Sequence, residues 1–214
     1  MMEATIVPAA REATPAHRRR GLAVAFLGPD GAGKSTVIKG LQSELDRRGI
    51  AHQYHHLQVR WWKSGVGITV SDPHGRPPRG TLASIAKLGW FLARAWPAWI
   101  VRVMPARRRG EWIILDRCFT DLLVDQRRYR YGGPMWLARL TDRLMPAPDA
   151  LVVLHAPAEV IHRRKAEVPP EVLARLLDGY RDLAIQRGNA RLVDVTASPA
   201  EVLTGLLPRL GLDP

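Results

Sequence analysis

The sequence predicts an α/β fold, in which helices pack on both faces of a mainly parallel sheet. Three observations support this prediction. Short apolar runs alternate with longer helical patterns along the chain, as expected of parallel strands joined by crossover helices. The runs are continuously apolar, which is typical of strands buried on both faces. A glycine-rich turn, GPDGAGKST, directly follows the first of these runs.

The elements of the N-terminal half introduce this pattern. Residues 22–28 form an apolar run that ends in glycine and predicts a buried strand. A helix is predicted over 34–50 because its apolar residues recur every three to four positions, with Gly49 as its stop. Residues 51–57 predict a second strand.

The pattern continues through the rest of the chain. A long helix is predicted over 81–104, and Pro97 within it should kink it. The last helix is predicted to open at residue 198 with a capping box, because serine there is followed three positions later by glutamate. The other predicted elements are helices at 119–128, 134–145 and 171–187 and strands at 111–116, 150–156 and 191–195.

Length and charge limit the possibilities further. The 214 residues predict one domain over 21–214, after a mobile tail at 1–20 that is rich in Ala, Pro and Arg. The formal charge of +12 favours polyanionic partners such as nucleotides, nucleic acid or anionic lipid. A solvated surface rich in arginine explains the same charge equally well.

Cysteine usage and the longest apolar stretch exclude other classes of protein. Cys118 is the only cysteine, so neither an internal disulfide nor a cysteine-based zinc site is predicted, which fits the cytoplasm. The apolar stretch LGWFLARAWPAWIVRVM is interrupted by arginine and proline. It therefore does not predict a membrane-spanning helix.

The turn GPDGAGKST has the spacing of a phosphate-binding loop. Gly31 and Gly33 permit a tight turn in which successive N–H groups face phosphate oxygens, and the following helix adds the positive end of its dipole. Lys34 is predicted to contact the β- and γ-phosphates, and the Ser35 hydroxyl to bind Mg²⁺. The predicted ATP-binding residues of this loop are Gly28, Pro29, Asp30, Gly31, Ala32, Gly33, Lys34, Ser35 and Thr36.

Two further motifs predict phosphate chemistry. In WIILDRC, Asp116 ends a buried strand, where a carboxylate is costly without a partner; it is predicted to share Mg²⁺ with Ser35, while Arg117 binds phosphate. A structural Asp–Arg pair is the alternative. In HRRKAEVPP, residues 162–170, three cations cluster between two helices. This segment is predicted either as a lid over ATP or as a solvated helix end.

From about Leu22 to Leu210 the sequence resembles the thymidylate kinase family. The resemblance is carried, in order, by FLGPDGAGKST, RGEWIILDR, PAEVIHRRKAE and VDVTASPAEV. It implies a P-loop kinase fold, a three-layer sandwich with a five-stranded parallel sheet and a short basic lid at about 162–170. It also implies transfer of the γ-phosphate of ATP, with Mg²⁺, to an acceptor that is itself phosphorylated.

The resemblance also implies roles for individual residues. Asp30 would contact a sugar hydroxyl of the acceptor, and Thr196 belongs to the loop that holds adenine. Some relatives carry a catalytic arginine at the position of Gly31, so here the lid would supply it. The implied catalytic residues are Lys34, Asp116, Arg117, Arg163 and Arg164.

The acceptor pocket departs from the family pattern. Trp90 and Arg94 stand one helical turn apart, as in the pair that clamps thymine, and Gln126 is at a matching place. Asp121 replaces a hydroxyl residue and Asp125 an aromatic one; the arginines at 127, 128 and 130 are able to pair with these carboxylates. The predicted acceptor-binding residues are Asp30, Arg60, Trp90, Arg94, Arg117, Asp121 and Gln126.

Three functions remain open from the sequence. The first is a nucleoside monophosphate kinase, with dTMP as the default acceptor, and the family precedent favours a homodimer. The second is a kinase for a sugar or related hydroxyl, resembling thymidylate-kinase-like proteins of surface polysaccharide synthesis, with Asp30, Asp116 or Asp121 as the base. The third is an ATPase on nucleic acid or a membrane surface, using the tryptophan-rich helix, although no motif for specific nucleic-acid recognition is present.

Overall fold

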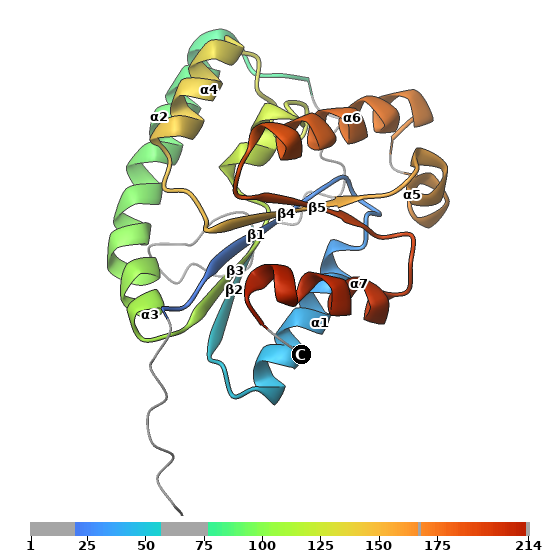
Figure 1. Ribbon diagram of the computed structural model, residues 1–214. Helices are drawn as coiled ribbons and strands as arrows, with labels where there is room; N and C mark the ends of the chain where they lie inside the picture. Colours follow the sequence, from blue (N-terminus) through green and yellow to red (C-terminus); the bar gives the residue numbers. More distant parts are fainter. Residues whose placement is uncertain (1–19, 57–76, 167, 213–214) are drawn as a thin grey trace, which may run out of the picture.

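The computed structural model describes residues 20–56, 77–166 and 168–212. Within them, five strands form one parallel sheet in the order β2-β3-β1-β4-β5 (Figure 1). This confirms the predicted α/β fold. The strands are β1 (Ala23–Leu27), β2 (His52–His56), β3 (Trp112–Asp116), β4 (Ala150–His155) and β5 (Ala190–Asp194). The predicted tail lies outside the described residues except for Arg20, and Arg60 lies outside them as well.

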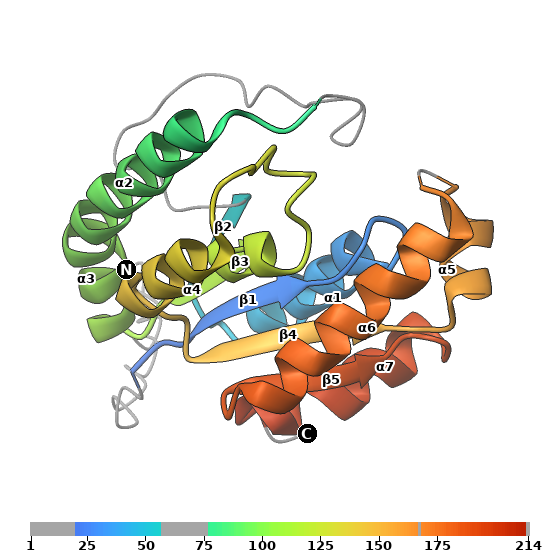
Figure 2. The same cartoon turned by 90° about the horizontal axis from the view of Figure 1, so that it is seen from above.

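Helices lie on both faces of this sheet, with α1 and α7 on one face (Figure 1). Seen from above, α6 runs over β4 and β5, while α2 and α4 lie side by side at the other end of the same face (Figure 2). The α-helices are α1 (Lys34–Arg47), α2 (Thr81–Ala98), α3 (Met104–Arg108), α4 (Met135–Leu144), α5 (Ala158–Arg164), α6 (Pro170–Gln186) and α7 (Pro199–Leu206).

The strand β1 shows why the layers form. All five of its residues are buried. Val24 and Phe26 pack into a cluster with α1 and α7, whereas Ala25 and Leu27 pack on the opposite face with residues of α3 and α6. Because side chains alternate along a strand, a continuously apolar strand contributes to both cores at once. The phosphate loop that follows is therefore fixed to the centre of the sheet.

Two predicted helix signals can be checked directly. The capping box of α7 is present, with reciprocal hydrogen bonds between Ser198 and Glu201. Pro97 lies within α2, and two residues after it the backbone changes to a π-helix over Trp99–Val103 before α3 begins. Proline has no N–H group to donate, so the regular ladder is interrupted near this position.

The predicted helix at 119–128 is wrong. Only Phe119–Leu123 is helical, as a 3₁₀ turn, and irregular turns follow it. Asp125 accepts the backbone N–H of Arg128 at 3.1 Å. Such a local side-chain acceptor competes with helical hydrogen bonding, and here it shapes a loop that reaches the phosphate loop.

Among the described residues, no helix is both long enough and apolar enough to cross a membrane. The structure divides the interrupted apolar stretch between α2, the π-helical segment and α3.

Candidate active site

The phosphate loop joins β1 to α1 at the carboxyl end of the sheet. Gly31 and Gly33 have φ angles of 84° and 81°, a left-handed conformation that glycine adopts without strain. The helix α1 then starts at Lys34 with no side-chain cap and no acidic residue in its first turn. Its first N–H groups and the positive end of its dipole thus favour an anion.

Lys34 is buried inside this loop. Its ammonium donates hydrogen bonds to the carbonyl oxygens of Gly28 at 2.9 Å and Pro29 at 2.8 Å, and lies 3.7 Å from the Asp30 carboxylate. Burial, and then the charge of Arg117, lower the pKa of Lys34 from 10.5 to about 8. The loop therefore holds a cation that its surroundings only partly compensate.

The Asp116–Arg117 pair stands next to the loop. Asp116 is paired with Phe26 of β1 in the sheet register, and the N–H of Arg117 donates to the carbonyl of Phe26 at 3.0 Å. Arg117 has a φ of 76°, which is costly for a residue with a side chain and typical of functional sites. The turn directs a buried guanidinium toward the phosphate loop.

The Asp30 carboxylate is the meeting point of the site. It accepts a hydrogen bond from Nη2 of Arg117 at 2.6 Å and forms a second ion pair with Nη2 of Arg128. Lys34 is the third cation near it. Residues from the phosphate loop, the end of β3 and the 124–133 loop thus converge on one carboxylate. Three cations therefore gather around one carboxylate.

Asp121 lies behind Arg117 and is completely buried. Its oxygens accept hydrogen bonds from Nη1 of Arg117 at 2.7 Å, from Tyr129 at 3.0 Å and from Tyr180 at 2.6 Å. The expectation that Asp121 touches the acceptor is corrected by this geometry, because both oxygens already bind internal donors. Asp121 instead holds Arg117 in place.

This arrangement fixes the charge of Arg117. Burial by itself lowers the pKa of a guanidinium, but Asp121, the tyrosines Tyr180 and Tyr129, and Asp30 together raise it well above its ordinary value. Burial and Asp121 also raise the pKa of both tyrosines. The tyrosine hydroxyls therefore keep their protons and donate to Asp121 at neutral pH.

Asp116 and Ser35 fit a magnesium site of the predicted kind. One Asp116 oxygen accepts a hydrogen bond from Tyr54 at 3.1 Å, while Oδ1 is buried without a hydrogen-bond partner among the described residues. A buried carboxylate oxygen is costly without a hydrogen-bond donor or a cation, so this oxygen is suited to a cation or to one of its water ligands. Ser35 is exposed in the first turn of α1. Among the described residues no three His, Cys, Asp or Glu side chains form a group that could hold a metal ion.

The start of the segment predicted as a lid lies against the phosphate loop. A Cβ atom on Gly31 would meet Lys165 Cβ at 3.0 Å and the Ile161 carbonyl at 3.1 Å, so an arginine at this loop position would displace the lid. Arg163 is exposed, whereas Arg164 donates to the carbonyl of Val195 at 3.0 Å. The structure thus places Arg164 beside the β5–α7 loop.

Other predicted residues lie around this centre. The N–H of Thr196 donates to Asp194 at 2.8 Å, and Thr196 is exposed on the β5–α7 loop. The guanidinium of Arg94 stacks on the Trp90 ring with 4.5 Å to its centroid, which confirms that the two share one helix face. Gln126 is exposed on the loop after the 3₁₀ turn. The carboxylate of Asp30 is contacted by Lys34, Arg117 and Arg128, whereas the acceptor candidates lie on α2 and on the loop after the 3₁₀ turn.

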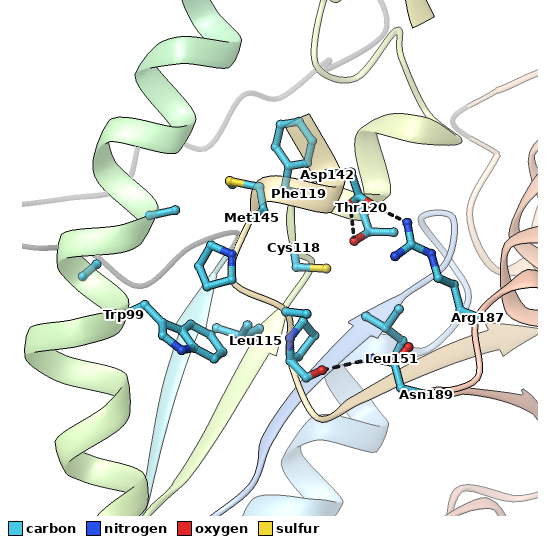
Figure 3. A pocket seen from close by; sticks show the side chains of 15 residues that line it. Trp99, Leu115, Cys118, Phe119, Thr120, Asp142, Met145, Leu151, Arg187 and Asn189 are labelled. Atoms are coloured by element: carbon cyan, nitrogen blue, oxygen red, sulfur yellow. Dashed lines mark hydrogen bonds and ion pairs between the residues drawn. The ribbon is translucent and has the colours of Figure 1, made fainter. Parts of the chain in front are cut away.

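A separate pocket lies on the sheet face between α2 and the end of α6 (Figure 3). Its walls include Trp99, Phe119 and Met145, and none of the described residues lining it belongs to the phosphate loop. Its ionised groups bind each other, since Asp142 accepts from Thr120 at 2.8 Å and pairs with Arg187. The loop, where the charges converge, is therefore the candidate active site.

Sequence reasoning missed three contributors to the site. Tyr180 falls in the helix predicted over 171–187 and Tyr54 in the strand predicted over 51–57, and neither residue is assigned a role by its sequence context. Arg128 was expected only to pair with a carboxylate; it does so with Asp125, at 3.2 Å from Nε, but also reaches Asp30. The run RRYR at 127–130 indicated a concentration of positive charge around Arg128. No sequence pattern, however, relates Tyr180 to Asp121, which lies 59 positions earlier.

Comparisons with curated proteins find several similar sequences. A thymidylate kinase of Akkermansia muciniphila is 27% identical over 148 residues, which cover 68% of each chain. One of Xylella fastidiosa is 27% identical over 87% of this chain and 85% of its own length. One of Nitratidesulfovibrio vulgaris is 27% identical over 84% and 88%. No family model matches the sequence.

Proposed function

This chain belongs to the thymidylate-kinase-like family, and from that premise we propose that it transfers the γ-phosphate of ATP to a nucleoside monophosphate, with dTMP as the default acceptor. The family indicates a kinase. We also propose the identity of the acceptor and the roles of the individual residues. We place the reaction in the cytoplasm, in line with the single, buried thiol of Cys118.

One observation carries this proposal: the Asp30 carboxylate of the phosphate loop joins Arg117 at 2.6 Å and Lys34 at 3.7 Å. Lys34 belongs to the donor side of the site, where the loop and the start of α1 favour the phosphates of ATP. Arg117 belongs to the acceptor side. Phosphoryl transfer requires the two sides to meet at one point, because its rate depends mainly on positioning and charge neutralisation.

The residues then have the following roles. Lys34 and Arg117 stabilise the negative charge on the transferred group, and Arg164 and Arg163 bring further positive charge from the lid. Mg²⁺, held by Ser35 and Asp116, neutralises charge between the β- and γ-phosphates when it is bound. A phosphate acceptor is already an anion and needs no general base. This agrees with Asp121, whose oxygens are used to hold Arg117.

The test is ADP release from ATP and Mg²⁺ with separate acceptors: dTMP, other nucleoside monophosphates, thymidine and neutral sugars. We expect turnover with dTMP in the range of about 1–100 s⁻¹. Turnover with a neutral sugar and none with any nucleoside monophosphate would replace this proposal by the sugar-kinase alternative. ATP hydrolysis that depends on DNA or anionic vesicles would favour the third function. The Lys34→Met variant serves as the blank.

We further propose that the chain forms a homodimer through α4 and the neighbouring part of α2. Trp136, Leu140 and Leu144 form an exposed apolar stripe along α4, and the indole N–H of Trp96 on α2 donates to the carbonyl of Leu144 at 2.9 Å. Figure 2 shows the two helices side by side. An apolar face spread over two helices is typical of a protein–protein contact.

For this contact, Leu140→Glu is expected to shift the protein from dimer to monomer, because it places a charge in the middle of the stripe. Light scattering coupled to size-exclusion chromatography measures the mass. Ile185→Glu is the matched control, since Ile185 is 74% exposed and belongs to α6 rather than to α4. Equal masses for the two variants would exclude this face as the dimer contact.

A further inference from the structure

We propose that Arg128 is a second phosphate-binding residue of the acceptor site, and that with Arg117 it selects acceptors carrying a phosphate monoester. This inference rests on the proposed function and specifies its substrate class. It starts from an unusual contact, in which Nη2 of Arg117 and Nη2 of Arg128 bind the two oxygens of one carboxylate, Asp30. Two guanidinium groups that reach one carboxylate are close enough to share one phosphate.

Each of the two arginines is held from behind by its own carboxylate. Nη1 of Arg117 donates to the buried Asp121 at 2.7 Å. Nε of Arg128 donates to the buried Asp125 at 3.2 Å, and the Arg128 backbone N–H donates to the same carboxylate at 3.1 Å. These contacts leave the Nη2 groups directed at Asp30. Both cations are thus oriented before any ligand arrives, which lowers the entropic cost of binding.

Asp30 differs from the two acids behind the arginines. Its side chain is 23% exposed, whereas Asp121 and Asp125 are almost completely buried. Asp30 also lies on a loop, so of these three carboxylates it is the most accessible to an incoming anion. A phosphate dianion carries more charge than a carboxylate and offers three acceptor oxygens. It is therefore expected to replace Asp30 as the partner of both arginines.

The same contact works against neutral acceptors. A sugar hydroxyl offers no charge that competes with the Asp30 carboxylate, so both arginines stay paired with Asp30 and the position remains filled. Asp30 thereby acts as an internal competitor that only a stronger anion displaces. Such discrimination has two parts: the right ligand gains contacts with the arginines, and the wrong ligand would have to break the Asp30 ion pairs without replacing them.

The test compares Arg128→Gln with Arg127→Gln. Arg127 is the adjacent arginine and is exposed, so it matches the change in charge without the contact to Asp30. The probes are dTMP and inorganic phosphate, titrated calorimetrically into full-length protein with a non-hydrolysable ATP analogue and Mg²⁺ present, so that the donor loop is filled. We expect Arg128→Gln to weaken both probes at least tenfold, with the affinity for the ATP analogue unchanged and with Arg127→Gln like the parent protein.

Equal phosphate affinities for the Arg128→Gln and Arg127→Gln variants, or no phosphate binding by the parent protein, would overturn the inference. If Arg128→Gln fails to fold, Arg128→Lys decides: it keeps the charge but loses the planar fork, and binding as tight as in the parent refutes a two-arginine site. A failure of the proposed function looks different. In that case dTMP binds to no variant, while inorganic phosphate still distinguishes Arg128→Gln from Arg127→Gln.

Discussion

Replacement of Lys34 by methionine is expected to lower the rate of phosphoryl transfer by about 10²–10³-fold, the usual effect of removing one group that stabilises developing charge. The ammonium of Lys34 sits within the phosphate loop, bonded only to carbonyl groups of that loop and close to Asp30. Methionine fills similar space without the charge. The rate is measured as ADP release with saturating ATP and dTMP.

The same substitution is expected to leave the free energy of unfolding at pH 7 unchanged or slightly higher. The pKa of Lys34 in the folded protein is about 8, below the ordinary 10.5. Below pH 8 both folded and unfolded states are protonated, and folding buries a charged group at a cost that its two hydrogen bonds offset only in part. Between pH 8 and 10.5 the unfolded state binds more protons, so the parent protein gains stability there relative to Lys34→Met.

Urea unfolding at pH 7 and pH 9.5 measures this difference, with Lys39→Met as the control. Lys39 is exposed on the same helix, so its replacement is expected to change neither the transfer rate nor the pH dependence of stability. A Lys34→Met variant that transfers phosphate at the parent rate would show that the loop does not bind the donor.

The second large effect is on stability. Asp121→Asn is expected to lower the free energy of unfolding by about 3–5 kcal/mol, the usual result of removing one partner from a buried ion pair. Arg117 is 3% exposed and donates to Asp121 at 2.7 Å, and Tyr129 and Tyr180 donate to the same carboxylate. An asparagine has no charge to compensate the guanidinium. Its amide NH₂ group would also face the hydrogen-bond donors of Arg117 and the two tyrosines.

Urea denaturation measures this effect, and two comparisons interpret it. Tyr180→Phe removes one hydrogen bond to a charged group and is expected to cost about 1.5–3 kcal/mol. Asp178→Asn changes an exposed aspartate of α6 and is expected to cost less than about 0.5 kcal/mol. An Asp121→Asn variant as stable as Asp178→Asn would mean that Arg117 does not depend on this carboxylate for its burial.

The donor half of the site was predictable from the sequence. Its residues are consecutive, from Gly28 to Thr36, and the geometry that they adopt follows from local rules. Glycine at 31 and 33 allows positive φ angles, and a helix start without an acidic residue presents its N–H groups to an anion. The sheet was predictable for a similar reason, because apolar runs buried on both faces are typical of parallel strands.

The segment after Arg117 was not predictable in this way. Residues 119–128 have a composition that favours a helix, yet only a 3₁₀ turn forms. Burial of Asp121 against Arg117 and Tyr180, and the Asp125 contact to the Arg128 backbone, fix a different path. Tertiary contacts of buried charges outweigh helix propensity, which amounts to less than about 1 kcal/mol per residue.

By itself, the sequence determined the order of the five strands along the chain, the phosphate loop with Lys34, and the presence of ionised side chains after β3. Only the tertiary structure decided which of these charges meet. Asp30 lies 87 and 98 positions before Arg117 and Arg128 in the chain but forms ion pairs with both, while Asp121 lies in the interior. The reason is physical: the pairing of buried charges depends on distance and access to water, and both are set by how the layers pack.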